Sequence, residues 1–518
     1  MSALLAAGPA FPTPVIEYSA IAPMLVVFTA ALLGVVVEAF VPRLLRRRAQ
    51  LVLTFVALVV ALGFVVAERG RREFVVEGAV AIDGPALFLQ GTILVVAFVA
   101  ALVMAERSVD PAGDAFAPRA SALPGSIDEQ ELTARGWLQT EVWPLFLFSV
   151  GGMMLFPAAT DLLTMFVALE ILSLPLYLLA GMARRRRLLS QEAALKYFVL
   201  GAFSSGFFLY GTALLYGYAG SVSLSAIATA LSVNSQASLL VVAGATLVTV
   251  GLLFKVAAAP FHQWTPDVYV GAPTPVTGFM AAGVKVAAFG ALLRIMYVAL
   301  GGLRWDWRPV MYVVAVLTMV VGTIIALTQS DIKRMLAYSA IAQTGFMLIG
   351  VLSTSALGLS GTMFYLLAYG LATVGAFAVV TLVRDPAGEA THLSQWVGLG
   401  KRSPIVAAAF ALFLLAFAGI PLTSGFSGKF AVFTAGVAGG ATAVVVIAVI
   451  VSAVAAFFYI RVIVLMFFSE PAADGPVVVV PSSFTTVAVA LTAAATIVLG
   501  VLPQPVFDLV AHAGVFIR

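Results

Sequence analysis

Residues 255–271 read KVAAAPFHQWTPDVYVG, a lysine followed by a polar, proline-flanked segment at the end of an apolar run. A second stretch, GIPLTSGFSGKF at 419–430, interrupts another apolar run and also carries a lysine. Irregular polar backbone is tolerated at membrane depth only where protein or a water-filled cavity surrounds it. Both stretches therefore predict discontinuous helices in a membrane protein.

The composition places the chain in a lipid bilayer. Of its 518 residues, 62% are hydrophobic and 10% are charged, and long apolar stretches in such a chain indicate membrane spans. A helix needs about 20 apolar residues to cross the hydrocarbon core. Fourteen runs of this kind occupy roughly residues 15–41, 51–67, 85–105, 141–157, 161–182, 192–219, 238–258, 273–300, 309–328, 334–353, 360–382, 404–436, 439–468 and 484–504.

These runs predict an all-α integral membrane protein with an internal repeat. Helices 4 to 8 and helices 9 to 13 form two blocks of five, and because five is odd the blocks enter the membrane from opposite faces. Inverted repeats with broken helices at matching positions are typical of secondary transporters. We divide the chain into residues 1–140 (helices 1 to 3 and a loop), 141–300 (first repeat), 301–468 (second, inverted repeat) and 469–518 (helix 14).

The loop charges predict an orientation. The loops after helices 1, 3, 5, 9 and 11 carry 16 of the 28 Lys and Arg residues, whereas the loops on the opposite side carry six. By the positive-inside rule these odd-numbered loops are cytoplasmic, which leaves both termini outside. The run of four arginines at 184–187 could form a patch for nucleic acid or lipid, but we favour a topogenic loop.

Six cations fall inside the expected spans, and most of them are lysines. Four of the six lysines in the chain are placed there, against two of the twenty-two arginines. Lysine differs from arginine in that it can lose its proton when it is desolvated, so the bias favours a proton relay. The alternative is that each cation snorkels or closes a structural ion pair. The six are Lys196, Lys255, Lys285, Arg294, Lys429 and Arg461.

One carboxylate, Glu170, breaks the symmetry of the repeat, because Tyr338 stands at the matching offset of the second block. An unpaired carboxylate in this medium takes up a proton, whereas pairing with Lys196 on the next helix would keep both groups charged. We expect switching of this pair to act as a gate. Pro175 removes one helical hydrogen bond and either kinks helix 5 or simply packs there.

Three motifs resemble a known family. FHQWTPDVYV at 261–270 with GAPTPVT at 271–277, GIPLTSGF at 419–426 with GKF at 428–430, and DIKRMLAYSA at 331–340 closely resemble the subunit N family of the bacterial proton-pumping NADH:quinone oxidoreductase, respiratory complex I. The resemblance covers helices 4 to 13. In the same antiporter-like group, an L-type subunit is expected to carry a long lateral helix after helix 14 and an M-type subunit a glutamate at position 429, so subunit N matches best.

The resemblance implies roles for five residues. Glu170 and Lys255 would form the input pair of a proton relay, Lys196 and Lys285 would link onward, and Lys429 would be the output site. His262 is a further candidate, since an imidazole beside a helix break could pass protons between Lys255 and Lys285. It could equally be an interfacial, hydrogen-bonded histidine.

The resemblance also implies partners and cofactors. The chain would sit in the bacterial cell membrane with the other membrane-arm and peripheral subunits of complex I, and its activity would be that of a translocase subunit. It would bind no cofactor, because flavin and iron-sulfur clusters belong to other subunits; the chain has no cysteine and only three histidines. Two alternatives remain, namely an Mrp-type cation/proton antiporter subunit and a non-conducting membrane scaffold.

Overall fold

The computed structural model describes residues 16–517, except 111, 112, 120, 124, 234–237, 386, 387 and 472–475. Its helices are α1 (Ala22–Phe40), α2 (Arg43–Ala67), α3 (Gly84–Met104), α4 (Ile127–Ala134), α5 (Val142–Leu155), α6 (Leu162–Ala180), α7 (Arg187–Ala219), α8 (Leu224–Val233), α9 (Leu239–Lys255), α10 (Trp264–Gly271), α11 (Thr274–Arg294), α12 (Arg304–Thr328), α13 (Ile332–Leu352), α14 (Ala356–Leu382), α15 (Leu399–Arg402), α16 (Pro404–Ala418), α17 (Ser424–Ala438), α18 (Thr442–Phe468), α19 (Ser483–Val501) and α20 (Gln504–Ala513).

Short elements join these helices. A π-helical turn η1 (Ile295–Ala299) extends α11, and 3-10 turns occur at η2 (Gly301–Leu303) and η3 (Leu393–Trp396). One hairpin pairs β1 (Glu73–Val75) with β2 (Val80–Ile82). A second small sheet has the order β4 (Gly388–Glu389), β3 (Val383–Asp385), β5 (Val477–Val478).

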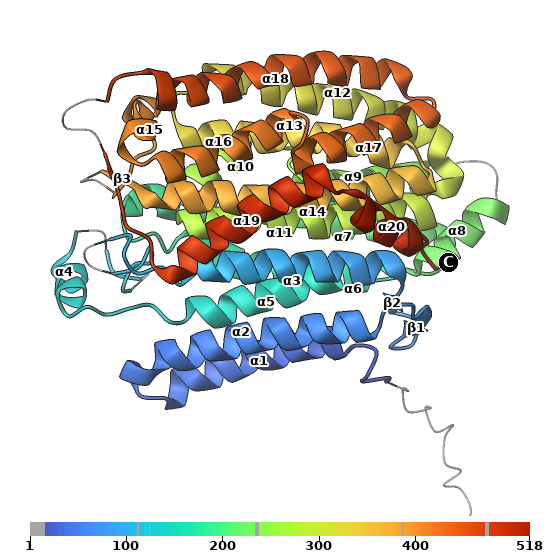
Figure 1. Ribbon diagram of the computed structural model, residues 1–518. Coiled ribbons are helices and arrows are strands. Elements are labelled where there is room, and N and C mark those ends of the chain that lie inside the picture. The colour runs from blue at the N-terminus through green and yellow to red at the C-terminus, as the bar shows by residue number, and fades with distance from the viewer. Residues whose placement is uncertain are drawn as a thin grey trace, which may run out of the picture.

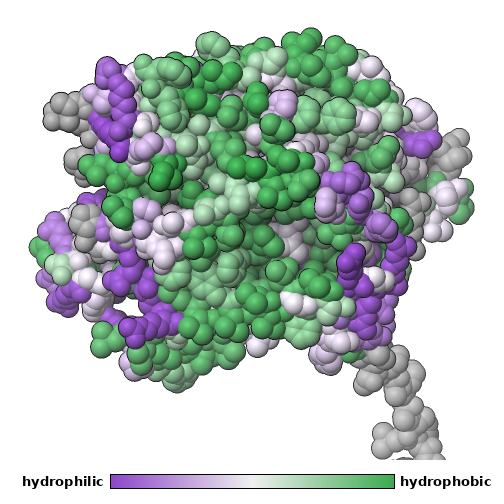
Figure 2. Space-filling view, in the orientation of Figure 1, coloured by the Kyte–Doolittle hydropathy of each residue, from purple (hydrophilic) through white to green (hydrophobic). Residues whose placement is uncertain are grey.

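The long helices lie roughly parallel, with α1 and α2 along one edge and α12 and α18 along the other (Figure 1). An apolar band crosses the middle of the molecule, and hydrophilic residues gather at the two ends of the helices (Figure 2). Eleven helices in the described residues are long and apolar enough to cross a membrane. The chain is a multi-pass membrane protein, as the hydropathy pattern predicts.

Each of the fourteen expected runs coincides with a helix, and the run 404–436 comprises the two half-helices α16 and α17. The predicted fold class is therefore confirmed; residue 15, where the first run was expected to begin, lies outside the described residues. Both expected interruptions are present. Helix α9 ends at Lys255 and α10 begins at Trp264, whereas α16 ends at Ala418 and α17 begins at Ser424.

The centre of the bundle is formed by α11, α13 and α14. The most apolar part of α11 and of α13 is completely buried by protein, and that of α14 nearly so. A helix that is apolar on all sides belongs in such a core. By contrast, less than half of the most apolar part of α1, α2, α12, α18 and α19 is buried by protein, as in helices that face lipid. Polar groups on the central helices are therefore surrounded by protein on every side.

The loop between α3 and α5 covers the arginine run that precedes α7. Three of the four arginines pair with acidic residues of this loop, and the fourth donates to the segment that carries β4. Three of the four guanidinium charges are thus paired with carboxylates of this loop, which argues against a basic patch for a nucleic acid. The pairs are Arg184 with Asp114 (2.9 Å), Arg185 with Asp110 (2.7 Å) and Arg187 with Glu129 (3.1 Å).

A buried ion pair ties the N-terminal helices to the core. The guanidinium of Arg294, at the end of α11, binds both carboxylate oxygens of Asp83 at 2.8 and 3.0 Å, and its Nε donates to the carbonyl of Pro157. Asp83 also caps α3 through the backbone N–H of Ala86 and accepts from the backbone N–H of Ile517. For Arg294, one of the six cations expected in the spans, the structural ion pair is therefore the observed role.

We predict that Asp83→Ala destabilises the chain by about 3–5 kcal/mol, because it leaves a buried guanidinium without its counter-charge. Thermal unfolding of the full-length chain in mild detergent checks this. Asp306→Ala, at an exposed position of α12, is the matched control and should unfold like the wild type. An unchanged unfolding temperature for Asp83→Ala would contradict this account of the ion pair.

A carboxylate outside the spans fastens α19 to the end of α3. Glu106 accepts hydrogen bonds from the backbone N–H and hydroxyl of Ser108 on one oxygen and from those of Ser482, the N-cap residue of α19, on the other. Burial alone would raise the pKa of Glu106, but these hydrogen bonds outweigh it and lower the pKa from 4.5 to about 2. The ionised form is therefore the one that holds the tether.

The pKa of Glu106 is lower in the folded chain than in the unfolded chain, so its ionised carboxylate stabilises the fold at pH values above the unfolded-state pKa. This contribution is lost as the pH falls through the folded-state pKa. Glu106→Gln cannot titrate, so the difference in unfolding temperature between wild type and variant isolates this residue. We expect the difference to be constant above about pH 5.5 and to shrink as the pH falls from about 4.5 toward 2. A difference that does not change over this range would contradict the assignment.

Candidate functional site

Lys255 lies at the first helix break, as the last residue of α9. Its side chain is buried, and Nζ donates to the hydroxyls of Ser173 (2.8 Å) and Tyr177 (3.3 Å) on α6. The rings of Tyr177 and Tyr197 lie 5.5 and 5.8 Å from Nζ, within reach of a cation–π interaction. Neutral groups, and no carboxylate, hold this ammonium in the described part of the chain.

Glu170 lies on the same face of α6 as these hydroxyls, since residues three and four apart on a helix are neighbours and Ser173 is three residues further on. Its Oε1 atom is buried and has no hydrogen-bond partner. No ion pair within 4.0 Å joins Glu170 to Lys255 or Lys196 among the residues that the structure describes. Glu170 and Lys255 thus form no closed ion pair in the described residues, and their role as an input pair stays a prediction.

Lys196 differs most from its expected place. Its Nζ binds Glu192 (2.6 Å) on the same helix and Asp267 (2.7 Å) on α10, and its side chain is 41% exposed. Asp267 also binds Arg334 of α13 at 3.1 Å. Lys196 is therefore paired with Asp267 of the broken-helix motif and with Glu192, and not with Glu170, and the gate between Glu170 and Lys196 stays a prediction. Lys196 lies at the exposed margin of α7 and not inside the bundle.

Lys285 lies in the middle of the buried helix α11. Nζ donates to the carbonyl of Ala340 (2.5 Å) and to Oγ1 of Thr344 (2.8 Å), both on α13. The ring of Tyr369 lies 5.0 Å away. The Thr344 hydroxyl in turn donates to the carbonyl of Val256, the residue after Lys255, at 2.7 Å. A single hydroxyl thus bridges the Lys285 ammonium and the end of the helix that carries Lys255.

Lys429, on α17, occupies the second helix break. Nζ donates to the carbonyls of Phe417 (2.9 Å) and Ala418 (3.1 Å) and to the hydroxyl of Ser452 (2.8 Å). The two carbonyls end α16, and the last carbonyls of a helix have no intrahelical partner and carry partial negative charge. Gly419 permits the approach: its φ is +81°, and a Cβ there would lie 2.9 Å from Cδ of Lys429.

A buried hydrogen-bond network on α13 leads from Lys285 toward Lys429. The amide nitrogen of Gln343, next to Thr344, donates to the Phe417 carbonyl at 2.8 Å, so Gln343 and Lys429 share one acceptor. Tyr365 donates to the amide oxygen of Gln343. The Tyr459 hydroxyl lies 3.4 Å from the amide nitrogen of Gln343, and it also bonds to Ser339.

Two further candidates lie off this route. His262 is half-buried in the first break, and its Nδ1 has no hydrogen-bond partner. No hydrogen bond links His262 to Lys255 or Lys285 in the described ranges. Thr344, and not His262, bonds both to Lys285 and to the carbonyl of the residue after Lys255. Arg461 is exposed on α18 and donates to the carbonyl of Leu327 at 3.3 Å.

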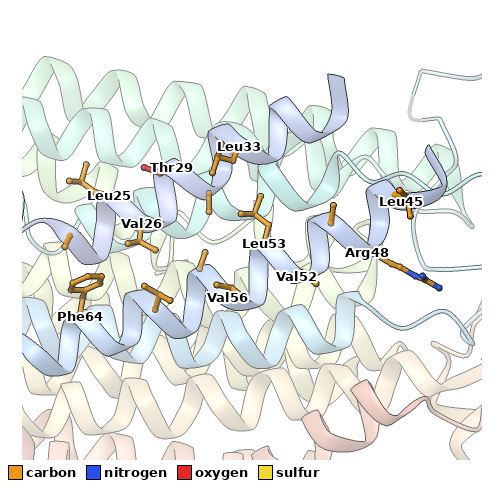
Figure 3. Close-up of a pocket in the computed structure, with 15 residues that line it drawn as sticks. Leu25, Val26, Thr29, Leu33, Leu45, Arg48, Val52, Leu53, Val56 and Phe64 are labelled. Carbon is orange, nitrogen blue, oxygen red and sulfur yellow. The ribbon is translucent and has the colours of Figure 1, made fainter. Parts of the chain in front are cut away.

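A groove of about 850 Å³ between α1 and α2 is separate from this site (Figure 3). Apolar side chains such as Leu33, Val52 and Phe64 line it, with Thr29 and Arg48 as its polar members. None of the buried lysines lines it. Within the described residues, no group of three or more His, Cys, Asp or Glu side chains is placed to hold a metal ion.

Lys255, Lys285 and Lys429 thus share one type of environment. Each is buried, each donates to hydroxyl or carbonyl oxygens, and each faces an aromatic ring. Their charge is solvated by dipoles and not cancelled by a counter-ion. Because lysine can release a proton from such surroundings whereas arginine cannot, the arrangement can change its protonation state without breaking an ion pair.

Comparison with known proteins identifies the family. The model described as "NADH:quinone oxidoreductase/Mrp antiporter, TM" matches residues 159–455. NADH-quinone oxidoreductase subunit N of Rhodococcus opacus is 61% identical over 534 residues, or 99% of each chain. The subunit N of Acidothermus cellulolyticus is 58% identical and covers both chains completely.

Solved structures agree with this. A chain of respiratory complex I from Thermus thermophilus with bound aureothin has a TM-score of 0.77 at 32% identity and covers 95% of this chain and 100% of its own. A chain of the Mrp complex from Dietzia sp. has a TM-score of 0.81 at 23% identity, covering 96% and 97%, a likeness of fold alone. The resemblance drawn from the motifs is confirmed, and the chain belongs to the NADH-quinone oxidoreductase subunit N family.

Proposed function

We propose that this chain is a proton-translocating subunit in the membrane arm of an NADH:quinone oxidoreductase. Lys255, Lys285 and Lys429 carry the protons, and Glu170 controls the first step. The observation that carries the proposal is the shared environment of the three lysines, which lie on the broken or central helices of the bundle and are held by neutral oxygen atoms. A structural lysine would instead be expected to have a carboxylate partner, as Lys333 has in Glu389.

The relay starts with Glu170 on α6 and Lys255 at the end of α9. We infer that quinone reduction in another subunit changes charge or hydration at the boundary of this one, and that Glu170 then closes on Lys255 or releases it. A released Lys255 is an unpaired ammonium in a medium of low dielectric constant, and it passes its proton toward Lys285 and then Lys429. The direction follows from the position of the single carboxylate at one end.

The energies allow such a relay. Moving one elementary charge against the membrane potential costs about 2.3 kcal/mol per 100 mV. A change of one pKa unit between two states of a group corresponds to about 1.36 kcal/mol. Pairing and unpairing of a buried lysine changes its proton affinity by a few such units, so one switch per proton suffices.

Lys196 and His262 have smaller roles in this proposal than the motifs suggested. Glu192 and Asp267 keep Lys196 charged at the exposed margin of α7. We assign it to the boundary with a neighbouring subunit, where Asp267 connects it to Arg334 on the central helix α13. His262 has no bond to the relay lysines in the structure as described, and we give it no step.

The partners, cofactors and location follow from the same proposal. The chain assembles with the other membrane-arm and peripheral subunits of complex I in the bacterial cell membrane. The arginine-rich loops lie on the cytoplasmic side and the termini on the other. Flavin and iron-sulfur clusters are held by other subunits, since a chain without cysteine cannot supply the thiolate ligands that clusters use.

We predict that Lys255→Met and Glu170→Gln, each in the assembled complex, lower proton pumping by about tenfold or more, because each change corresponds to at least one lost charge interaction in the relay. If coupling is tight, NADH:quinone reductase activity falls with it. Pumping is measured in vesicles with a pH-sensitive dye while NADH is oxidised. Lys401→Met is the matched control, since Lys401 is an exposed lysine of the short helix α15 and is paired with Glu470.

The rival functions give different results in the same vesicles. A non-conducting scaffold predicts full pumping in both variants, and this outcome would overturn the proposal. A cation/proton antiporter subunit predicts proton-linked sodium flux without NADH, which the proposal does not. The identity to the subunit N relatives favours the oxidoreductase over the antiporter, for which the likeness is one of fold.

A further inference from the structure

Thr344 is a buried residue of α13 that bonds to Lys285 and to the carbonyl of Val256, the residue after Lys255. Its hydroxyl oxygen accepts from Lys285 Nζ at 2.8 Å. Its proton has two acceptors within reach, the carbonyl of Val256 at 2.7 Å and that of Ala340 at 3.1 Å. The shorter bond goes to Val256, which follows Lys255 and is the C-cap residue of α9.

A hydroxyl has one proton to donate, and a lysine ammonium has donors only. While Lys285 holds its proton, Thr344 must therefore accept from it, and its own proton is free for the Val256 carbonyl. Once Lys285 is a neutral amine, it offers a lone pair, and the Thr344 hydroxyl can rotate to donate to it across the same 2.8 Å. The Val256 carbonyl then loses its partner.

The freed carbonyl acts on Lys255. The last carbonyls of a helix carry partial negative charge, which favours a cation nearby. The carbonyl of Phe254 keeps the Trp264 indole as donor, so the change at this helix end falls on Val256. Loss of a proton from Lys285 thus strengthens the potential that holds a charge on Lys255.

We propose that Thr344 is a positioning residue whose hydroxyl links the protonation states of Lys255 and Lys285. When Lys285 loses its proton, the protonated form of Lys255 is favoured, so the two lysines hold one transferable proton between them at a time. The inference rests on the proposed relay and adds to it a reason for stepwise transfer. It needs no covalent chemistry and no group outside the chain.

One titratable side chain faces Lys285 directly, and others lie on the helices packed around α11. Tyr369 on α14 faces the ammonium directly. The remaining elements packed against α11 carry Glu170 and Tyr177 on α6, Lys255 on α9, and Asp267 and Tyr269 on α10, while Asp83 neutralises Arg294 on α11 itself. Asp267 is already bound by Lys196 and Arg334. Within α13, Tyr338 lies closest in sequence to the Lys285 contacts.

The test uses the assembled complex in vesicles and compares Thr344→Val, Thr344→Ala and Thr344→Ser. The first two lack the hydroxyl, and the third retains it. Thr381→Val is the matched control, because Thr381 is a buried threonine of α14 whose hydroxyl bonds to its own helix at Phe377. Proton pumping per NADH oxidised is recorded as a function of pH.

We expect Thr344→Val and Thr344→Ala to lower pumping by about tenfold, the effect of losing one hydrogen bond to a charged group. We also expect them to shift the pH profile by about half a unit or more, because Lys285 and Lys255 no longer titrate as a coupled pair. Thr344→Ser and Thr381→Val should stay within about twofold of the wild type, and their pH profiles should not move.

Two outcomes would overturn the inference: normal pumping with an unchanged profile in Thr344→Val and Thr344→Ala, or equal loss in Thr344→Ser. Lys285→Met, measured alongside, separates the two proposals. If Lys285→Met pumps normally, the relay itself fails. If Lys285→Met is impaired and the variants without the hydroxyl are not, only the role of Thr344 fails.

Discussion

Three ammonium groups lie inside the membrane-spanning bundle, and the oxygen atoms that hold them are neutral. Charge in hydrocarbon is costly unless polar groups surround it. The chain supplies hydroxyls from Ser173, Tyr177 and Ser452 and backbone carbonyls at the end of α16 and within α13. At the second break this constraint shapes the architecture, because free carbonyls require a broken helix, and a broken helix at membrane depth requires a complete protein coat.

The two breaks solve this problem in different ways. Lys429 points back from α17 onto the open end of α16 and binds the released carbonyls directly. Lys255 ends α9 and reaches across to hydroxyls of α6, while Trp264 and Thr344 cap carbonyls at its own helix end. A carboxylate, Glu170, lies on α6 three residues before the Ser173 that holds Lys255, whereas Tyr338 stands at the matching offset of the second block, so the two halves differ chemically.

Helix α13 connects the halves. Thr344 bonds to Lys285, and the neighbouring residue Gln343 bonds to the carbonyl that holds Lys429. Residues side by side on a helix point in different directions, about 100° apart, which lets one helix contact both lysine sites. The complete burial of α13 keeps these bonds away from bulk water and lipid.

The sequence predicted the local features well. Hydropathy located the fourteen apolar runs, and proline and glycine located the two helix breaks. The unequal use of Lys and Arg indicated that Lys255, Lys285 and Lys429 lie inside the membrane spans. The partners could not be predicted in the same way. Thr344 lies 59 residues from Lys285, and Asp267 lies 71 residues from Lys196, so these contacts depend on how helices pack. For the same reason, the ion pairs between the arginine run and the loop before α5 could not be predicted from the amino-acid composition.

The central claim is that the buried lysines change their protonation during turnover. The most direct measurement is the number of protons pumped per NADH oxidised by the reconstituted complex with Lys429→Met, at matched NADH oxidation rates. The account predicts a lower ratio than in the wild type, because the last lysine of the relay is missing. An unchanged ratio would contradict it.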